Sequence, residues 1–326
     1  MSETIVGVDI SKETFQAAKL GDKSIREEFV NKPGDFEEFG NWLERHAGQS
    51  VRVCMEATGA YGLELAMWLV DQGIETNLVN PARVRAYADS ELNRNKTDKS
   101  DAACIARFCQ AHDPAEWTPS DPERRTLQQL VRRVFSLEEM KAQEKNRRKQ
   151  PAMSPLIATD IDEHIEQLEC RLSQLWNKIE AWISQHTELQ EAMDLLTSIP
   201  GVGRKTAAKL IGEIQDIDRF DSAKKLAAFA GVTPKNVQSG TSINKPASLS
   251  KMGSSRLRAA LYMPAIVARR HNPIVGRFCQ RLETNGKHKK SVIGAAMHKL
   301  IRLVYGVWSK RQKFEADYLE AAQNPA

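Results

Sequence analysis

The chain opens with short apolar runs that are rich in β-branched residues and separated by polar turns, a pattern that predicts β-strands. Thr4 to Asp9 is the first of these runs, and further strands are expected over 14–20, 24–31, 51–56 and 75–80. Apolar residues recur with helical spacing over 34–46 and 61–72, and another helix is expected to begin near Asp98. Residues 1–118 are therefore predicted to form an α/β domain.

The order of these elements narrows the fold of the predicted α/β domain. Three consecutive strands, followed by alternating helices and strands, is the order of the ribonuclease-H-like (RuvC-like) fold. In that order the first and fourth strands are neighbours. Asp9 and Glu56 end these two strands, so we expect the two carboxylates to converge.

Apolar positions between residues 119 and 190 follow a heptad rhythm. From Ile161 to Trp182, apolar residues are spaced alternately four and three apart, which is the seam of a coiled coil. Pro151 and Pro155 interrupt the helix upstream of this run. A shorter run before the break repeats the rhythm at Leu127, Leu130, Val134 and Leu137. The pattern predicts a helical hairpin or coiled coil, and it favours a homo-oligomer (dimer or tetramer) over two helices that pack only on their own domain.

Charge is distributed unevenly along the chain. The 326 residues carry a formal net charge of +5, yet residues 201–313 hold 23 Lys and Arg against 5 Asp and Glu, a local net charge of +18 that leaves −13 for the remainder. A polyanion is the natural partner of such a segment. A basic surface kept only for solubility would not need the charge confined to one half. We therefore expect the C-terminal part, residues 191–326, to bind nucleic acid.

Composition argues against several classes of protein. The five cysteines form no CxxC pair, which argues against a structural zinc site and favours a reducing compartment. The first residues are polar, and no apolar run approaches the roughly 18 to 20 residues of a membrane span. We expect no membrane partner and a cytoplasmic protein that is associated with the nucleoid when it is bound to DNA.

Four carboxylates in the predicted α/β domain form a candidate metal site. Asp9 and Glu56 end strands, while Asp98 and Asp101 lie three residues apart at the start of a helix, where such residues project from one face. Crowded carboxylates repel one another unless a cation holds them, and hard oxygen ligands suit Mg²⁺ or Mn²⁺. A single Asp at a strand end is usually a cap or turn residue. Four acids in this order predict a nuclease-type metal site.

A glycine turn near the start of the basic segment predicts a phosphate-binding motif. Gly201 and Gly203 precede a helical sequence, as in a helix-hairpin-helix, whose turn leaves backbone N–H groups free to hold a phosphate. A Pro-Gly turn before any helix would look similar. The basic residues expected to contact nucleic acid here and further along are Arg204, Lys205, Lys209, Lys251, Arg256 and Arg258.

A polar stretch, residues 238–246, contains a Ser-Gly pair at Ser239. We expect a flexible basic loop here, which can present a hydroxyl to a phosphodiester. Most serines of this kind are turn residues. From chemistry alone, Ser239 is therefore a weak candidate.

These stretches, in this order, resemble the DEDD transposases of the insertion-sequence family IS110 over nearly the whole chain. The order of motifs is highly specific. The matching motifs are Gly-Val-Asp9-Ile-Ser-Lys, Glu56-Ala-Thr-Gly-Ala-Tyr, Val-Asn80-Pro-Ala, Asn95-Lys-Thr-Asp98-Lys-Ser-Asp101-Ala, Ile-Pro-Gly-Val-Gly203, Phe-Ala-Gly-Val-Thr-Pro234, Ser239-Gly and Arg-Ala-Ala-Leu-Tyr-Met-Pro264.

The resemblance implies a RuvC-like domain (1–118), a coiled-coil linker (119–190) and a mainly α-helical transposase domain (191–326) with a nucleophilic serine. It also implies a recombinase guided by a structured non-coding RNA, the bridge RNA, which pairs with double-stranded donor and target DNA. Ser239, five residues after Pro234, fits the family pattern better than Thr241 or Ser242, and it would form a covalent 5′-phosphoserine. The residues that would hold the metal and assist this step are Asp9, Glu56, Asp98 and Asp101.

Two other functions remain open at the level of sequence. A RuvC-type, metal-dependent, structure-specific DNA endonuclease would hydrolyse four-way DNA with water as the nucleophile, but it needs neither the Ser239 region nor a long C-terminal domain. A non-catalytic nucleic-acid-binding protein derived from a transposase would not need four intact carboxylates. Because the serine and the acids lie in different predicted domains, the recombinase hypothesis also predicts an active site that can form across subunits.

Overall fold

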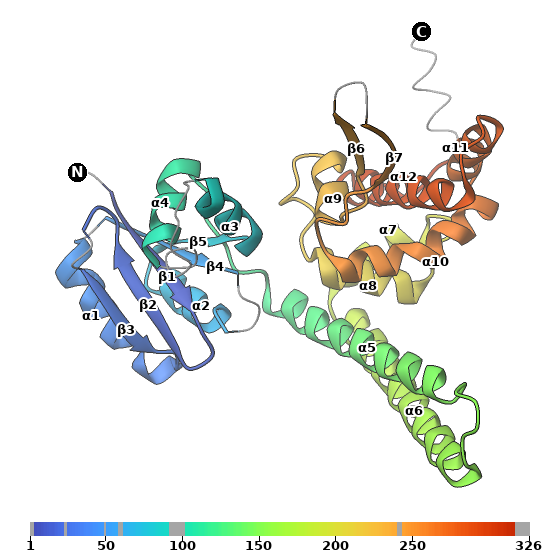
Figure 1. The fold of residues 1–326 in the computed structure, drawn as a ribbon, viewed down its shortest axis with the longest axis horizontal. Helices are drawn as coiled ribbons and strands as arrows, with labels where there is room; N and C mark the ends of the chain where they lie inside the picture. Colours follow the sequence, from blue (N-terminus) through green and yellow to red (C-terminus); the bar gives the residue numbers. More distant parts are fainter. Residues whose placement is uncertain are drawn as a thin grey trace. The chain divides into compact units, whose positions relative to one another are not determined.

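A computed structural model describes residues 3–22, 25–48, 50–57, 61–90, 102–239 and 243–316 (Figure 1). The chain divides into two compact units, Met1–Pro119 and Ser120–Ala326. Within the described ranges, no helix is long and apolar enough to cross a membrane.

The first unit is an α/β domain built on one five-stranded sheet. Its strands are β1 (Thr4–Ile10), β2 (Thr14–Lys19), β3 (Arg26–Val30), β4 (Val51–Glu56) and β5 (Glu75–Val79). Across the sheet they lie in the order β3-β2-β1-β4-β5. Strand β2 pairs antiparallel to both β1 and β3, whereas β4 pairs parallel to β1 and β5 parallel to β4. The predicted pairing of the first and fourth strands is confirmed.

Helices cover both faces of this sheet. A short 3-10 helix (Pro33–Asp35) leads into α1 (Phe36–Ala47), which together with α2 (Leu63–Asp71) packs on the face that carries Val6 and Val8. The opposite face, with Ile5 and Cys54, packs against α3 (Pro81–Ser90) and α4 (Ala102–His112). Alternation of apolar residues along β1 therefore supplies two cores, one on each side of the sheet.

Helix α3, between β5 and α4, was not predicted from the sequence. Its start carries two local signals, Pro81 at the first helical position and the side chain of Asn80, whose Oδ1 accepts the N–H of Ala82 at 2.8 Å. Only Val84 and Ala88 are buried along this helix. The weak apolar pattern explains why periodicity alone missed it.

The second unit begins with an antiparallel helical hairpin made of α5 (Pro122–Arg147) and α6 (Pro155–Gln185) (Figure 1). The predicted break is confirmed, and Ser154 caps α6 by accepting the N–H of Ile157. The heptad seam of α6 packs inside the chain, because Leu168, Leu172 and Ile179 are buried in one cluster with residues of α5. The helical hairpin is thus confirmed, and a role in oligomer formation stays a prediction.

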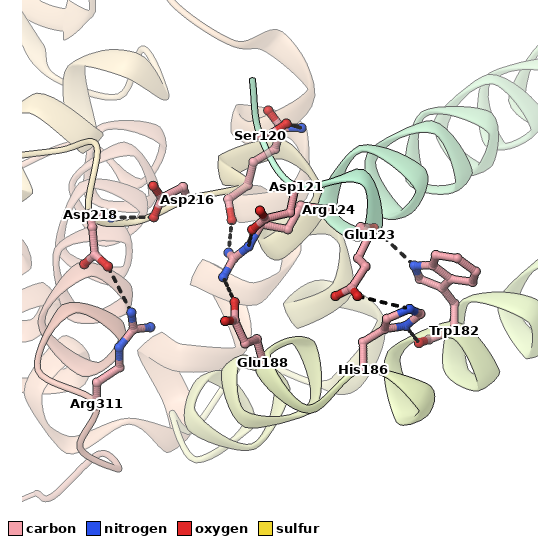
Figure 2. Close-up of polar contacts among 11 residues, drawn as sticks. Ser120, Asp121, Glu123, Arg124, Trp182, His186, Glu188, Asp216, Asp218 and Arg311 are labelled. Atoms are coloured by element: carbon pink, nitrogen blue, oxygen red, sulfur yellow. Dashed lines mark hydrogen bonds and ion pairs between the residues drawn. The ribbon is translucent and has the colours of Figure 1, made fainter. Parts of the chain in front are cut away.

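The root of the helical hairpin is tied to the rest of the second unit by polar contacts (Figure 2). Arg124 of α5 donates to the carboxylate of Glu188 at 2.8 Å and to the backbone carbonyl of Gln215. The indole Nε1 of Trp182 in α6 donates to the carbonyl of Glu123 at 3.1 Å. The Arg124 contacts tie the base of the hairpin to the helical body, and the Trp182 contact joins the two helices of the hairpin to each other.

The helical body contains α7 (Thr187–Thr197), α8 (Arg204–Ile214), α9 (Ala223–Phe229), α10 (Ser255–His271), α11 (Pro273–Thr284) and α12 (Lys289–Ser309). It shares one apolar core with the helical hairpin, and Trp308, fully buried in α12, belongs to this core. The second unit is therefore mostly helical, as the sequence predicts for this part of the chain.

The expectation of a flexible loop over 238–246 is wrong for the residues that the structure describes there. On either side of positions 240–242, which lie outside the described ranges, the chain pairs as an antiparallel two-stranded ribbon, β6 (Pro234–Ser239) and β7 (Ile243–Leu249), which projects from the helical body (Figure 1). Its sequence lacks the alternation of apolar and polar residues that signals a half-buried strand. Backbone pairing between the two strands satisfies the N–H and C=O groups that face each other without such a pattern.

Candidate active site

Asp9 and Glu56 lie side by side near the ends of two parallel strands. In the pairing of β1 with β4, Val8 is opposite Met55, so the next position of each strand places Asp9 beside Glu56. Side chains alternate between the faces of a sheet, and Val8 and Met55 pack in the cluster under α1 and α2. Both acids are therefore on the opposite face, the one covered by α3 and α4.

Gly7 allows α4 to approach this face closely. A Cβ at position 7 would lie 1.9 Å from the carbonyl oxygen of Ala102 and 2.5 Å from the amide nitrogen of Ala106. No side chain fits in that space. Gly7 precedes Asp9 by two residues on the same face of β1. The first turn of α4 thus lies against the strand immediately before the acids.

The electrostatic environment of Glu56 disfavours its negative charge unless a cation is nearby. Burial raises the pKa of Glu56, the neighbouring charge of Asp9 raises it further, and Arg85 of α3 opposes both effects. Two carboxylates held together in a half-buried position are stabilised by a nearby cation. The donor set therefore fits a hard divalent ion such as Mg²⁺ or Mn²⁺. Arg85, a positive residue on this face, was not singled out from the sequence.

The other two predicted ligands, Asp98 and Asp101, lie outside the described residues. Within the described ranges, no group of three or more His, Cys, Asp or Glu side chains is placed to hold a metal ion. The complete four-carboxylate site stays a prediction.

The predicted glycine turn joins α7 to α8. Gly201 has a φ of +105°, and a Cβ there would lie 2.7 Å from the Cβ of Ala268, so both the backbone and the close packing require glycine. Gly203 precedes α8 in an extended conformation and brings no side chain to cap it. The N–H groups of the first helical turn have no partner within the helix itself. The turn offers the backbone donors that phosphate binding needs, although phosphate binding itself stays a prediction.

The basic residues after this turn connect α8 to the helical hairpin. Arg204 forms an ion pair with Glu180 of α6, in which Nε lies 3.0 Å from Oε2. Lys209 donates to Glu138 of α5 at 2.7 Å. Lys205 lies over the ring of Trp176, 5.4 Å from its centroid. A phosphate bound by Arg204 or Lys209 has to compete with a carboxylate of the same chain, which the sequence did not reveal.

The three later basic residues fall into two groups. Arg258 supports the fold, because its Nη1 donates to the carbonyl oxygens of Ala230 and Lys251, both at 3.4 Å. This guanidinium bridges the end of α9 and the segment before α10. Arg256 and Lys251 are exposed and remain available for a polyanion. Nucleic-acid binding by all three stays a prediction.

Ser239 is the last residue of β6. It pairs with Ile243 of β7, so it stands at the closed end of the two-stranded ribbon. This position is at the far end of the ribbon from Pro234, which pairs with Leu249 at the root. The structure therefore places the candidate nucleophile at the end of a projecting arm.

Two family comparisons cover most of the chain. Residues 6–151 match a family of transposases, the DEDD type of IS110 elements, and residues 193–280 match the family described as transposase IS116/IS110/IS902. The first match contains the four candidate acids, and the second contains the glycine turn and Ser239.

Several relatives align over most of their length. The chain is 36% identical over 320 residues to the pilin gene-inverting protein of Moraxella bovis. This alignment covers 97% of the chain and 98% of the relative. The pilin gene-inverting protein of Moraxella lacunata has the same identity and coverage. The transposase for insertion sequence element IS1111A of Coxiella burnetii is 26% identical over 299 residues, covering 82% of this chain and 78% of the relative.

Proposed function

The chain belongs to the IS116/IS110/IS902 family of transposases, and from this premise we propose that it is the recombinase of an insertion element that cuts and rejoins donor and target DNA through a covalent phosphoserine. The observation that carries the proposal is the placement of Asp9 beside Glu56 at the ends of paired strands. Relatives named for gene inversion and for transposition support the same chemistry, strand exchange on double-stranded DNA.

We propose that Asp9, Glu56, Asp98 and Asp101 together bind Mg²⁺ or Mn²⁺. The strand order β3-β2-β1-β4-β5 supports a ribonuclease-H-like arrangement of this site. Asp101 is bonded to Ala102, whose carbonyl oxygen lies against Gly7, two residues before Asp9. When bound, a divalent ion polarises the phosphate and stabilises charge on the attacking and leaving oxygens. Arg85, on the same face, is suited to hold a non-bridging phosphate oxygen beside the acids.

Ser239 is the nucleophile in this proposal. Its Oγ loses a proton and bonds to phosphorus while the bond from phosphorus to the 3′ oxygen breaks, and that oxygen takes up a proton. The 5′ phosphate stays on the serine until the 3′ hydroxyl of another strand attacks it and restores Ser239. Each step exchanges one phosphate ester for another, so no external energy source is needed. A two-stranded ribbon fits the major groove of DNA, which supports a nucleophile at the end of this arm.

Resemblance to the family further supports a structured non-coding guide RNA, the bridge RNA, as a second partner. We propose that the basic segment 201–313, with a net charge of +18, binds both nucleic acids and that the turn at Gly201 and Gly203 holds a backbone phosphate. We also propose a homo-oligomer, dimer or tetramer, that acts on DNA at the nucleoid in the cytoplasm.

A suicide DNA substrate tests the nucleophile. The wild-type protein is expected to be trapped on a 5′ phosphate, and Ser239→Ala is expected to lose the adduct while it still binds DNA and RNA. Thr241→Ala and Ser242→Ala are matched controls for the register, and both should keep the adduct. If Ser239→Ala still cleaves and rejoins strands, the covalent mechanism is wrong and hydrolysis by water becomes the preferred reaction.

Recombination between donor and target plasmids, with and without the element's own non-coding RNA, tests the remaining parts of the proposal. Asp9→Asn, Glu56→Gln, Asp98→Asn and Asp101→Asn are each expected to abolish strand exchange and to weaken divalent-ion binding while the fold is kept. Retained recombination in any two of these variants contradicts a shared metal site. Equal recombination without the RNA contradicts guidance.

A further inference from the structure

A cleft of about 620 Å³ lies at the root of the β6–β7 arm. The first pair of the arm, Pro234 opposite Leu249, forms one wall. The other walls come from α11, the turn between α11 and α12, and the first half of α12. This volume is within the range of sites that bind small organic ligands.

The apolar walls of the cleft are buried or half-buried. They are formed by Val232, Leu249, Phe278 and Leu282. Two cations lie close to the ring of Phe278, Arg281 at 5.7 Å and Lys299 at 5.9 Å from its centroid. An aromatic ring in a positive field, next to aliphatic side chains, is a surface on which a planar, electron-rich ring can stack.

The exposed part of the lining is cationic, because it contains Lys287 and Lys290. Two histidines, His288 and His298, add further polar groups, and none of the described residues that line the cleft is Asp or Glu. The cleft also borders the N-terminus of α12, a helix of 21 residues with no acidic residue in its first turn. The positive end of the helix dipole therefore adds to the charge of the lysines. A free carboxylate would compete with an anionic ligand here, and the lining contains none.

Neither part of the cleft is explained by a simpler ligand. An inorganic anion does not need apolar walls around an aromatic ring, and an uncharged apolar ligand does not need a cationic lining. We propose that the cleft receives one unstacked nucleotide of the bound nucleic acid, with its base against Phe278 and its phosphates at Lys287 and Lys290. This inference rests on the proposed function, because it assumes a nucleic-acid strand running along the β6–β7 arm.

The position of the cleft limits which nucleotide it receives. Pro234 at the root and Ser239 at the end of the arm are five residues apart, which is roughly 17 Å of strand at about 3.3 Å per residue. That length matches about five nucleotides at 3.4 Å each. We therefore expect the extruded nucleotide about five positions from the strand cut. Binding of one unstacked base in the cleft would hold the nucleic acid close to the cut, at a point that neither Ser239 nor the metal site contacts.

The state of His298 agrees with this use of the cleft. Burial lowers its pKa, and the charges of Arg302 and Lys299 lower it further, so all three effects favour the neutral imidazole. A neutral imidazole has one donor and one acceptor nitrogen. It can therefore hydrogen-bond to the edge of a base, whereas the exposed lysines of the cleft hold phosphate oxygens.

Photo-crosslinking with the full-length protein tests the proposal. One arm uses a decathymidine DNA carrying a single 4-thiothymidine, and the other a decauridine RNA carrying a single 4-thiouridine. Crosslinked peptides are identified by mass spectrometry, and total binding is measured by fluorescence anisotropy. We expect crosslinks to peptides that contain Phe278 or His288, and the arm that gives them identifies DNA or RNA as the source of the nucleotide.

Two variants separate the cleft from the rest of the basic surface. Ala295 lines the cleft, so Ala295→Phe fills it without changing charge, and Phe278→Leu removes the ring while keeping an apolar wall. Each should reduce the cleft crosslink by roughly fivefold or more while total binding is largely kept. Lys290→Gln should weaken the crosslink more than Lys224→Gln, an exposed lysine of α9 that loses the same charge.

The experiment distinguishes a wrong nucleotide site from a wrong recombinase function. If both oligonucleotides bind but no crosslink falls on the cleft, the nucleotide site is wrong and the recombinase proposal is untouched. An unchanged crosslink in both Ala295→Phe and Phe278→Leu has the same meaning. If neither oligonucleotide binds at all, the nucleotide site and the nucleic-acid part of the proposed function are both wrong.

Discussion

At the scale of single residues, position 7 has no room for a methyl group, because a Cβ there would lie 1.9 Å from the carbonyl oxygen of Ala102. The start of α4 touches β1 where Gly7 has no side chain, and Asp101 is the residue before that helix. A side chain at position 7 would therefore displace Ala102, the first residue of α4. Gly7 is thus a positioning residue. Glycine is required there because the backbone of α4 lies too close for a side chain, and not because of a turn.

Gly7→Ala is expected to lower the free energy of unfolding by about 1 to 3 kcal/mol, the usual cost of overpacking, and to abolish strand cleavage. Chemical denaturation and a plasmid cleavage assay measure the two effects. Gly34→Ala is the matched control in the same unit, because nothing lies within 4 Å of a Cβ at that position. Wild-type stability and cleavage in Gly7→Ala would show that α4 tolerates the shift.

His298 should make the stability of the second unit depend on pH. Its pKa in the folded chain lies below the ordinary value of 6.5 because of burial and the charges of Arg302 and Lys299. As pH falls from 6.5 towards the folded pKa, the unfolded chain binds more protons than the folded chain, so the free energy of unfolding decreases. His298→Gln should remove this part of the dependence in urea denaturation between pH 5 and 7.5. An identical pH slope in the variant would contradict the assignment.

At the scale of elements, the helical hairpin buries its heptad seam within one chain. Leu168 and Ile179 of α6 share a cluster with Leu127 and Val134 of α5. A regular heptad seam in a sequence does not tell whether its partner is another subunit or the preceding helix. In this protein the preceding helix occupies it, and any contact between subunits has to use other residues.

Truncation of the seam is therefore expected to destabilise the protomer. Leu168, 5% exposed, should cost about 2 to 5 kcal/mol when replaced by alanine. Leu156, 84% exposed near the end of the same hairpin, should change stability by less than about 0.5 kcal/mol under Leu156→Ala. Sedimentation of both variants tests the oligomer. If Leu168→Ala dissociates an oligomer without loss of protomer stability, the seam belongs to the subunit interface.

At the scale of the whole molecule, charge separates the chain into parts with different partners. Residues 201–313 carry a net charge of +18 and the remainder −13. Part of the positive charge is already used, as in the ion pair between Lys209 and Glu138. The exposed remainder, including Arg256, is available to a polyanion. The number of phosphate contacts should therefore be smaller than the number of basic residues.

Binding of DNA or guide RNA should weaken steeply with salt. Each neutralised phosphate releases counterion, which gives a log–log slope of roughly −0.7 to −0.9 per contact. Affinity measured between about 50 and 200 mM salt gives the number of contacts. Glu138→Gln and Glu180→Gln should steepen the slope if Lys209 and Arg204 are then free to bind phosphate. A nearly flat response in the wild-type protein would show that the basic segment is not the nucleic-acid surface.

The sequence by itself determined those features that depend on local pattern and covalent order. Alternating apolar residues predicted the five strands of the first unit, and the heptad rhythm with its proline break predicted the helical hairpin. The order of elements predicted that β1 and β4 are neighbours and hence that Asp9 and Glu56 meet. The order of motifs also identified the family, because motif order along a chain needs no three-dimensional information.

Only the tertiary structure decided features that depend on contacts between residues far apart in the chain. It placed Asp9 and Glu56 on the face covered by α4, explained Gly7, and paired Arg204 and Lys209 with carboxylates of the helical hairpin. It also showed that residues flanking 240–242, expected to be a loop, pair in the β6–β7 ribbon through backbone groups and not through a side-chain pattern. Contacts between residues far apart in the chain leave no periodic pattern in the sequence. The type of a residue and its distance from neighbouring apolar residues do not show which distant residue it will contact.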